Sequence, residues 1–163
     1  MITLVLGGAR SGKSLVAERL AAGLAAPVTY LATATVGDAD HAERVAAHRA
    51  RRDPTWRTVE VGAGLVGTLS STSGSVLVDS IGTWVSAHED FAVDVAGLCA
   101  ALMHRAGDTV VVSEEAGLGV HPSSEAGRRF RDALGLVNAA LAEVCDDVLL
   151  VVAGRVLPLG RMP

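Results

Sequence analysis

The sequence predicts a single α/β domain in which a mostly parallel β-sheet is flanked by helices. Short, continuously apolar runs alternate with segments of helical periodicity along the 163-residue chain, a pattern typical of buried parallel strands joined by crossover helices. A glycine-rich segment stands between the first apolar run and the first helical pattern. Half of the residues are apolar, so the chain can bury one sizeable core. We expect residues 1–163 to form one domain.

The first elements are expected to be a strand, a glycine-rich loop and a helix. Residues 2–6 are a short run rich in branched apolar side chains that ends at glycines, which predicts a strand. Beyond the glycines, apolar residues stand four positions apart at Val16, Leu20 and Leu24. This spacing predicts a helix.

The next segments predict two strands with a helix between them. Residues 27–32 form a second apolar run, and residues 57–61 are expected to form another strand. Between them, Ala, Glu and Arg recur over residues 39–52 in a helix-like pattern that Asp53-Pro54 ends.

Three further buried strands are expected in the rest of the chain. They cover residues 75–78, 109–112 and 148–152, and the first of them ends in Asp79. Residues 67–75 are rich in Ser, Thr and Gly, which predicts a loop that leads from a helix into the first of these strands.

The clearest helix covers about residues 125–144. Its apolar side chains repeat at the alternating four and three spacing of one helix face, and Ser124 or Ser123 can cap its start. The apolar positions are Phe130, Leu134, Val137, Leu141 and Val144.

Composition excludes several classes of partner. The net charge is −4 and like charges form no long run, so no nucleic-acid partner is expected. The uncharged stretches 20–37 and 61–78 are broken by Gly, Pro, Ser or Thr, which predicts no membrane span. No signal-peptide pattern precedes the glycine-rich segment, so a cytoplasmic location is expected. Cys99 and Cys145 lie far apart and are expected to be reduced thiols.

The strongest motif is a phosphate-binding loop with the strand before it and the helix after it that its mechanism requires. It consists of Gly7, Gly8, Ala9, Arg10, Ser11, Gly12, Lys13 and Ser14. Backbone N–H groups of such a loop surround phosphate oxygens, Lys13 reaches the β and γ phosphates, and Ser14 ligates Mg²⁺. Lys13 is the one lysine of the chain. The predicted fold is therefore that of a P-loop NTPase, of the RecA-like type.

A second carboxylate is expected to help hold the magnesium, at the end of a neighbouring buried strand. Asp79 is the preferred candidate. Glu114 and Glu115 follow another strand and could hold metal, water or substrate, but a strand-end acid such as Glu114 equally often caps a following helix.

Several segments together resemble one family over nearly the whole chain. It is the family of bifunctional adenosylcobinamide kinases and adenosylcobinamide-phosphate guanylyltransferases. The loop has the form GGARSGKS, and the other matching segments are residues 30–34, 44–49, 56–60, 115–122 and 130–132.

The resemblance implies a two-step assembly of the nucleotide loop of cobalamin. A γ-phosphate of ATP or GTP passes to the aminopropanol hydroxyl of adenosylcobinamide. GMP from GTP then passes through a histidine, which aligns with His48, to adenosylcobinamide phosphate, giving adenosylcobinamide-GDP and pyrophosphate. The resemblance also suggests a homo-oligomer, with a trimer as one form. Nucleotide contacts carried over in this way are the phosphate loop, Ala32, Thr33, Ala34, Arg49, Ala50, Arg51, Arg52, Glu60 and Asp79.

The chemistry of His48 agrees with this role, because neutral imidazole is a covalent nucleophile. On a helix it would share a face with Arg44, Arg51 and Arg52. Without the resemblance, a solvated surface histidine would be the ordinary interpretation.

Two other functions stay open from the residues alone. One is a P-loop kinase for another small metabolite, and the other is a GTP-dependent switch protein. Trp56 and Trp84 are expected in core or subunit packing rather than in base stacking. His41, His88, His104 and His121 are expected in surface or loop positions, and no zinc site is implied.

Overall fold

The computed structural model describes residues 1–34 and 53–161. Its strands are β1 (Ile2–Gly7), β2 (Val28–Ala32), β3 (Arg57–Glu60), β4 (Ser75–Asp79), β5 (Thr109–Glu114), β6 (Asp147–Val152) and β7 (Arg155–Pro158). Its α-helices are α1 (Lys13–Ala22), α3 (Leu65–Ser71), α4 (Ile81–Ser86), α5 (Val95–His104) and α6 (Glu125–Val144), with short 3₁₀ turns η1 (Gly62–Gly64) and η2 (Glu89–Phe91).

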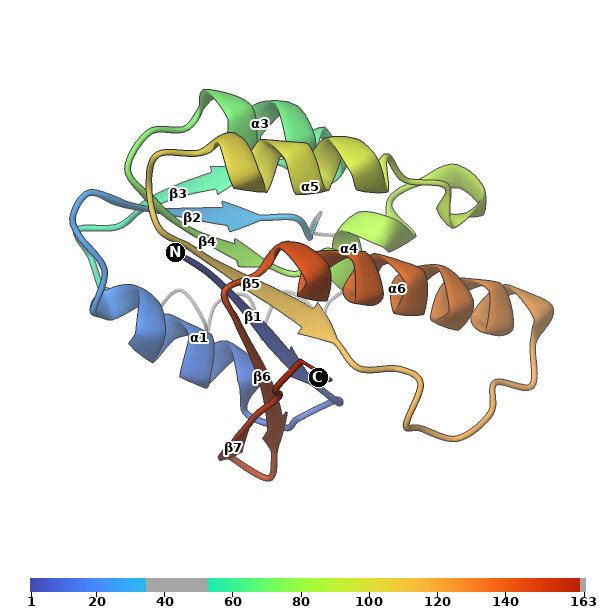
Figure 1. Ribbon diagram of the computed structural model, residues 1–163. Coiled ribbons are helices and arrows are strands. Elements are labelled where there is room, and N and C mark those ends of the chain that lie inside the picture. The colour runs from blue at the N-terminus through green and yellow to red at the C-terminus, as the bar shows by residue number, and fades with distance from the viewer. Residues whose placement is uncertain (35–52, 162–163) are drawn as a thin grey trace.

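The described strands form one seven-stranded sheet in the order β3-β2-β4-β5-β1-β6-β7. Every neighbouring pair is parallel except β6 and β7, which are antiparallel. Helix α1 covers one face of the sheet, and α3, α4, α5 and α6 cover the other (Figure 1). The predicted α/β fold with a mostly parallel sheet is confirmed.

Each face of the sheet has its own apolar core. Successive β1 residues point to opposite faces, so that Leu4 packs with α6 and Val5 packs with α1, and both are fully buried. The core under α6 also holds Trp84, whose indole N–H donates to the Ala63 carbonyl at 3.1 Å. The interpretation of Trp84 as a core residue is therefore confirmed.

The buried face of α1 is not the apolar series that predicts the helix. Ala17 and Ala21 are fully buried, whereas Leu20 is 36% exposed. The small alanine side chains let α1 lie close to the sheet directly after the phosphate loop. Val16 and Leu24 pack only partly against this core.

The loop predicted at residues 67–75 is wrong in its first half, because residues 67–71 belong to α3. Leu65 and Leu69 of this helix are fully buried and anchor it to α5. Its Ser and Thr hydroxyls donate back to carbonyls of the preceding turn, as Thr68 does to Gly64 at 3.0 Å. The polar composition therefore suggested a loop, although two buried leucines stabilise a helix here.

The C-terminal elements agree with the expected pattern and add one strand. Helix α6 has the predicted bounds, and the Ser124 hydroxyl caps it by accepting from the Gly127 N–H at 3.1 Å. The antiparallel strand β7 was not foreseen. Among the described residues, Cys99 and Cys145 are free thiols, and no helix is long and apolar enough to cross a membrane.

Candidate functional site

The phosphate loop leaves the carboxyl end of β1, at the edge of the sheet where parallel α/β folds bind ligands. Gly12 has a φ of +93°, in the left-handed region that suits glycine, and α1 begins at the next residue. A Cβ on Gly7 would lie 2.8 Å from the Val151 carbonyl oxygen. The two glycines therefore serve backbone geometry that a side chain would oppose.

Backbone contacts brace the loop from inside and from the β6–β7 turn. The Ser11 N–H donates to the Gly8 carbonyl at 3.3 Å, and the Gly154 N–H of the turn donates to the Ser11 carbonyl at 2.8 Å. Strand β7 thus positions a turn that supports the loop. This contact joins residues more than 140 positions apart, so no local pattern could predict it.

Lys13 lies under the loop with its ammonium directed at two oxygens. Its Nζ donates to the Gly8 carbonyl at 3.3 Å and lies 3.8 Å from Oε1 of Glu114. The Lys13 side chain is only 12% exposed. A compact ammonium fits this position, and the planar fork of arginine would need more room.

Glu114 ends β5, the strand directly beside β1, and its Cα is in register with that of Gly7. Its Oε2 accepts the Gly82 N–H in the first turn of α4 at 2.9 Å. One carboxylate oxygen thus caps a helix, although this helix precedes β5 in the chain rather than following it, and the other oxygen lies near Lys13.

Asp79 ends β4, which lies two strands away from β1. The Tyr30 hydroxyl of β2 donates to its Oδ2 at 2.8 Å, which orients the carboxylate at the carboxyl edge. Ser14, in the first turn of α1, is half-buried. Their oxygens are the donor type that Mg²⁺ prefers.

Thr33 joins the end of β2 to the turn between β4 and α4. Its hydroxyl donates to the Ser80 carbonyl at 2.6 Å, accepts the Ser80 N–H at 2.8 Å and also contacts the Thr83 hydroxyl. Its own N–H donates to the Asp79 carbonyl at 3.2 Å. Because Thr33 is 1% exposed, this geometry assigns its side chain to the support of Asp79.

A family match covers almost the whole chain. The family described as cobinamide kinase / cobinamide phosphate guanyltransferase matches residues 3–159. This chain belongs to that family. The bifunctional adenosylcobalamin biosynthesis protein CobP of Pseudomonas aeruginosa is 41% identical over 172 aligned residues, which cover 100% of this chain and 99% of that protein. The bifunctional adenosylcobalamin biosynthesis protein CobU of Salmonella typhimurium is 35% identical, with 94% of this chain and 97% of that protein covered.

Solved structures with this fold are more distant in sequence. The flagellar accessory protein FlaH from Methanocaldococcus jannaschii has a TM-score of 0.50 at 13% identity, over 95% of this chain and 74% of that one. A prototypical ATPase from the type III secretion system of pathogenic bacteria has a TM-score of 0.51 at 11% identity, over 91% of this chain and 50% of that one. These likenesses support the P-loop NTPase fold alone.

The family resemblance implies further nucleotide contacts, and those among the described residues lie at the ends of strands away from the phosphate loop. Ala32 and Ala34 stand at the carboxyl end of β2, and Glu60 is exposed at the end of the edge strand β3. Four strand spacings separate β3 from β1, or about 19 Å. The structure therefore spreads these residues along one sheet edge rather than around the phosphate loop.

Other predicted site residues lie outside the described residues. They are the nucleophile candidate His48, the neighbouring Arg44, Arg49, Ala50, Arg51 and Arg52, and the expected helix over residues 39–52.

The remaining histidines within the described chain serve local contacts. His88 packs edge-on against Trp84, the His104 ring contacts the Ala100 carbonyl at 2.7 Å, and His121 lies beside Arg131. His41 falls in the part that is not described. Trp56 is half-buried and packs against the core under α1.

Two residues of the site were missed from the sequence. Gly82 makes room for the Glu114 carboxylate, because a Cβ there would lie 2.8 Å from Glu114 Cδ. The buried Asn138 of α6 donates to the Glu114 carbonyl at 3.0 Å. A polar residue on the apolar face of a helix was the available signal for Asn138.

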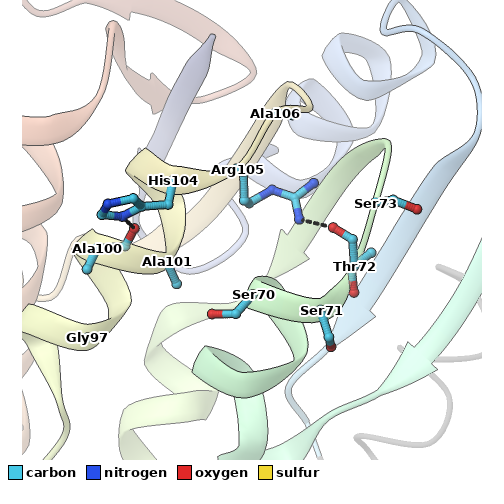
Figure 2. Close-up of a pocket in the computed structure, with 10 residues that line it drawn as sticks. All are labelled: Ser70, Ser71, Thr72, Ser73, Gly97, Ala100, Ala101, His104, Arg105 and Ala106. Atoms are coloured by element: carbon cyan, nitrogen blue, oxygen red, sulfur yellow. Dashed lines mark hydrogen bonds between the residues drawn. The ribbon is translucent and has the colours of Figure 1, made fainter.

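A cavity of about 480 Å³ lies between α3 and α5 (Figure 2). It is lined by residues 70–73 and by the C-terminal half of α5. Arg105 closes one side, and its guanidinium donates to the carbonyls of Leu69, Thr72 and Gly74. Burial lowers the pKa of Arg105 from its usual value. The cavity lies at the amino ends of β4 and β5, opposite the phosphate loop, and each guanidinium nitrogen of Arg105 donates to the protein.

Proposed function

We propose that the protein phosphorylates adenosylcobinamide on its aminopropanol hydroxyl and then transfers GMP from GTP to the resulting phosphate. The products are adenosylcobinamide-GDP and pyrophosphate. The observation that carries the proposal is the phosphate loop with Lys13 beneath it, at the carboxyl edge of the sheet, in a member of this family. ATP and GTP are the proposed substrates.

The proposed phosphate site uses backbone donors and one ammonium. The loop N–H groups and the amino end of α1 favour phosphate oxygens, and Lys13 balances the charge of the β and γ groups. With phosphate oxygens bound, Lys13 exchanges its contact with the Gly8 carbonyl for them. The Lys13 side chain is largely buried, which strengthens these interactions relative to water.

Mg²⁺ is the proposed metal, with Ser14 and Asp79 as its protein ligands. When bound to nucleotide phosphates, it neutralises the charge that develops during transfer. Among the described residues, no three His, Cys, Asp or Glu side chains gather into a metal cage. That fits magnesium, which binds through one or two protein groups together with phosphates and water.

His48 is the proposed nucleophile for guanylyl transfer. A neutral ring nitrogen attacks the α phosphorus of GTP, the bond to the β phosphate breaks, and pyrophosphate leaves while Lys13 holds its charge. Arg49, Ala50, Arg51 and Arg52 are proposed to flank the nucleotide, with the arginines on its phosphates.

The base is proposed to lie toward β3. Ala32 ends β2, the strand that separates β4 from β3, and Thr33 and Ala34 follow it. Glu60 can accept from the N1 and N2 donors of guanine. Their spread along the sheet edge suits a nucleotide that runs from β1 toward β3. We also keep a homo-oligomer, with a trimer as one form, and a cytoplasmic location as proposals.

The test uses GTP labelled at the α phosphate, with magnesium and without corrinoid. The wild type is expected to gain label that is labile to acid and stable to alkali, as a phosphoramidate is. His48→Ala should abolish the label, whereas His104→Ala, at the opposite edge of the sheet, should retain it. A wild type that binds GTP but takes no label would count against the guanylyl-histidine route and favour a kinase alone.

A further inference from the structure

Glu114 ends one of the two strands that flank β1, the strand that leads into the phosphate loop. Strand β5 lies between β1 and β4, and Glu114 is its last residue (Figure 1). The Cα atoms of Gly7 and Glu114 are in register. The carboxylate therefore emerges one strand spacing, about 5 Å, from the start of the loop.

The backbone of Glu114 is fixed by a buried network. Asn138 donates to its carbonyl at 3.0 Å, and the Ser113 hydroxyl donates to the Asn138 side-chain oxygen at 2.6 Å. The next residue, Glu115, donates its N–H to the Gly7 carbonyl at 3.0 Å. Because Ser113 and Asn138 are buried, this strand end is held against both α6 and β1.

The side chain is fixed as well, but through only one of its oxygens. Oε2 accepts the Gly82 N–H at 2.9 Å, and the missing Cβ of Gly82 leaves the space that the carboxylate fills. Oε1 points to the other side, 3.8 Å from Lys13 Nζ, and the side chain is 33% exposed. Glu114 thus presents a fixed carboxylate oxygen beside the ammonium that serves the γ phosphate.

We propose that Glu114 accepts the proton of the acceptor hydroxyl during phosphorylation. This role rests on the kinase half of the proposed function. As the hydroxyl oxygen forms its bond to the γ phosphorus, the bond from that phosphorus to the β–γ bridging oxygen breaks. The nucleoside diphosphate leaves with the electron pair, and the hydroxyl proton moves to Oε1 of Glu114 and later to water.

Only the phosphorylation step requires such a proton acceptor. A neutral imidazole attacks with a lone pair that is already available. In the final transfer, the attacking group is a phosphate oxygen that is ionised at neutral pH. An alcohol is the one nucleophile of the sequence that must lose a proton to a base as it attacks.

The main test compares three measurements on Glu114→Gln, which keeps the shape and the contact with Gly82. The kcat for adenosylcobinamide phosphorylation should fall roughly 10²- to 10⁴-fold, the usual contribution of a positioned base. Nucleotide affinity and the rate of self-guanylylation should stay within about threefold of the wild type, because neither uses the proton acceptor. Glu143→Gln removes the same charge from an exposed site on α6 and should leave all three unchanged.

A second variant moves the carboxylate without altering its charge. Gly82→Ala places a methyl group against Glu114 and should also lower the phosphorylation kcat while self-guanylylation persists. Gly67→Ala is the matched control, since a Cβ there meets nothing within 4 Å.

The outcomes separate the role of Glu114 from the function on which it rests. A wild type that phosphorylates cobinamide, together with a Glu114→Gln variant of equal kcat, overturns the base role alone. Equal losses of phosphorylation, self-guanylylation and nucleotide affinity also overturn it, because Glu114 would then act by holding Lys13. A wild type that phosphorylates no cobinamide overturns the kinase half and the base role together.

Discussion

Lys13 shows at the scale of one residue why a phosphate loop uses lysine. Its Nζ lies between the Gly8 carbonyl and the Glu114 carboxylate, at 3.3 and 3.8 Å, in a space that leaves the side chain 12% exposed. A point charge on a slim stem can turn from these oxygens to phosphate, whereas a guanidinium is wider and presents a fixed fork.

Lys13→Arg is therefore expected to impair both transfer reactions. We predict a fall in kcat/KM of roughly 10²- to 10³-fold for each, the usual effect of losing one positioned donor to a developing charge. Steady-state assays of phosphorylation and guanylylation check it, with Arg19→Lys on the exposed side of α1 as the control. A kcat/KM within threefold of the wild type, a difference of about 0.7 kcal/mol or less in activation free energy, would show instead that a positive charge alone is enough.

At the residue scale, the sequence correctly placed the phosphate loop between a strand and a helix. The loop from Gly7 to Ser14 is contiguous, so its residue types and spacing are enough to identify it. Which of Asp79 and Glu114 lies nearer to Lys13 depends instead on strand order, which the sequence does not show. Only the sheet shows that β5 stands beside β1 and brings Glu114 to Lys13, while Asp79 lies one strand further away.

At the scale of elements, the junction of β2, β4 and α4 depends on one buried hydroxyl. Thr33 binds both the carbonyl and the N–H of Ser80, the residue that follows Asp79. Thr83 also donates to the Ser80 carbonyl at 2.9 Å, so part of this support is duplicated. The orientation of Asp79 follows from this junction and from Tyr30.

Thr33→Val keeps the side-chain volume and removes the hydroxyl. We expect the free energy of unfolding to fall by about 1–3 kcal/mol, because buried polar groups of Ser80 lose a partner. Urea unfolding measures the change, and Thr33→Ser, which retains the hydroxyl, should lose less. If Thr33→Ser proves the weaker protein, packing of the methyl group rather than the hydrogen bonds holds the junction.

Element prediction succeeded for buried strands and α6 and failed where packing overrides composition. Residues 76–78 are all apolar and all buried, as expected of a strand covered on both faces. In α3, the Ser and Thr content suggested a loop, but Leu65 and Leu69 bury its inner face. In α1, alanines rather than leucines meet the sheet, because close approach to it favours small residues.

For the whole molecule, the candidate site and the Arg105 contacts lie at opposite edges of the sheet. The carboxyl edge carries the phosphate loop, Asp79 and Glu114, and the amino edge carries the Arg105 contacts around the cavity in Figure 2. The buried thiol of Cys145, which directly follows α6, adds a dependence of stability on pH. Burial, with smaller effects of Asp146 and Cys99, raises the pKa of Cys145 from 9.0 to about 12.

This raised pKa predicts a loss of stability in alkali. Below about pH 9, folded and unfolded chains both keep the Cys145 proton, so the contribution is fully present. Between about 9 and 12, the unfolded chain ionises first, so the free energy of unfolding falls as pH rises. The test is urea unfolding between pH 8.5 and 11, in pH steps of about half a unit. The free energy of unfolding should fall less steeply with pH for Cys145→Ala than for the wild type. Equal slopes would contradict the assignment to Cys145.

The most direct measurement of the central claim follows two phosphorus atoms into one product. Adenosylcobinamide is incubated with magnesium, ATP and GTP. Both nucleotides carry one isotope at the γ phosphate, and the GTP also carries a second isotope at the α phosphate. We predict a corrinoid product with both isotopes in a one-to-one ratio and one pyrophosphate released, because each transfer supplies one phosphorus of the diphosphate. A corrinoid with the γ isotope alone, or only nucleoside diphosphate and free phosphate, would contradict a bifunctional kinase and guanylyltransferase.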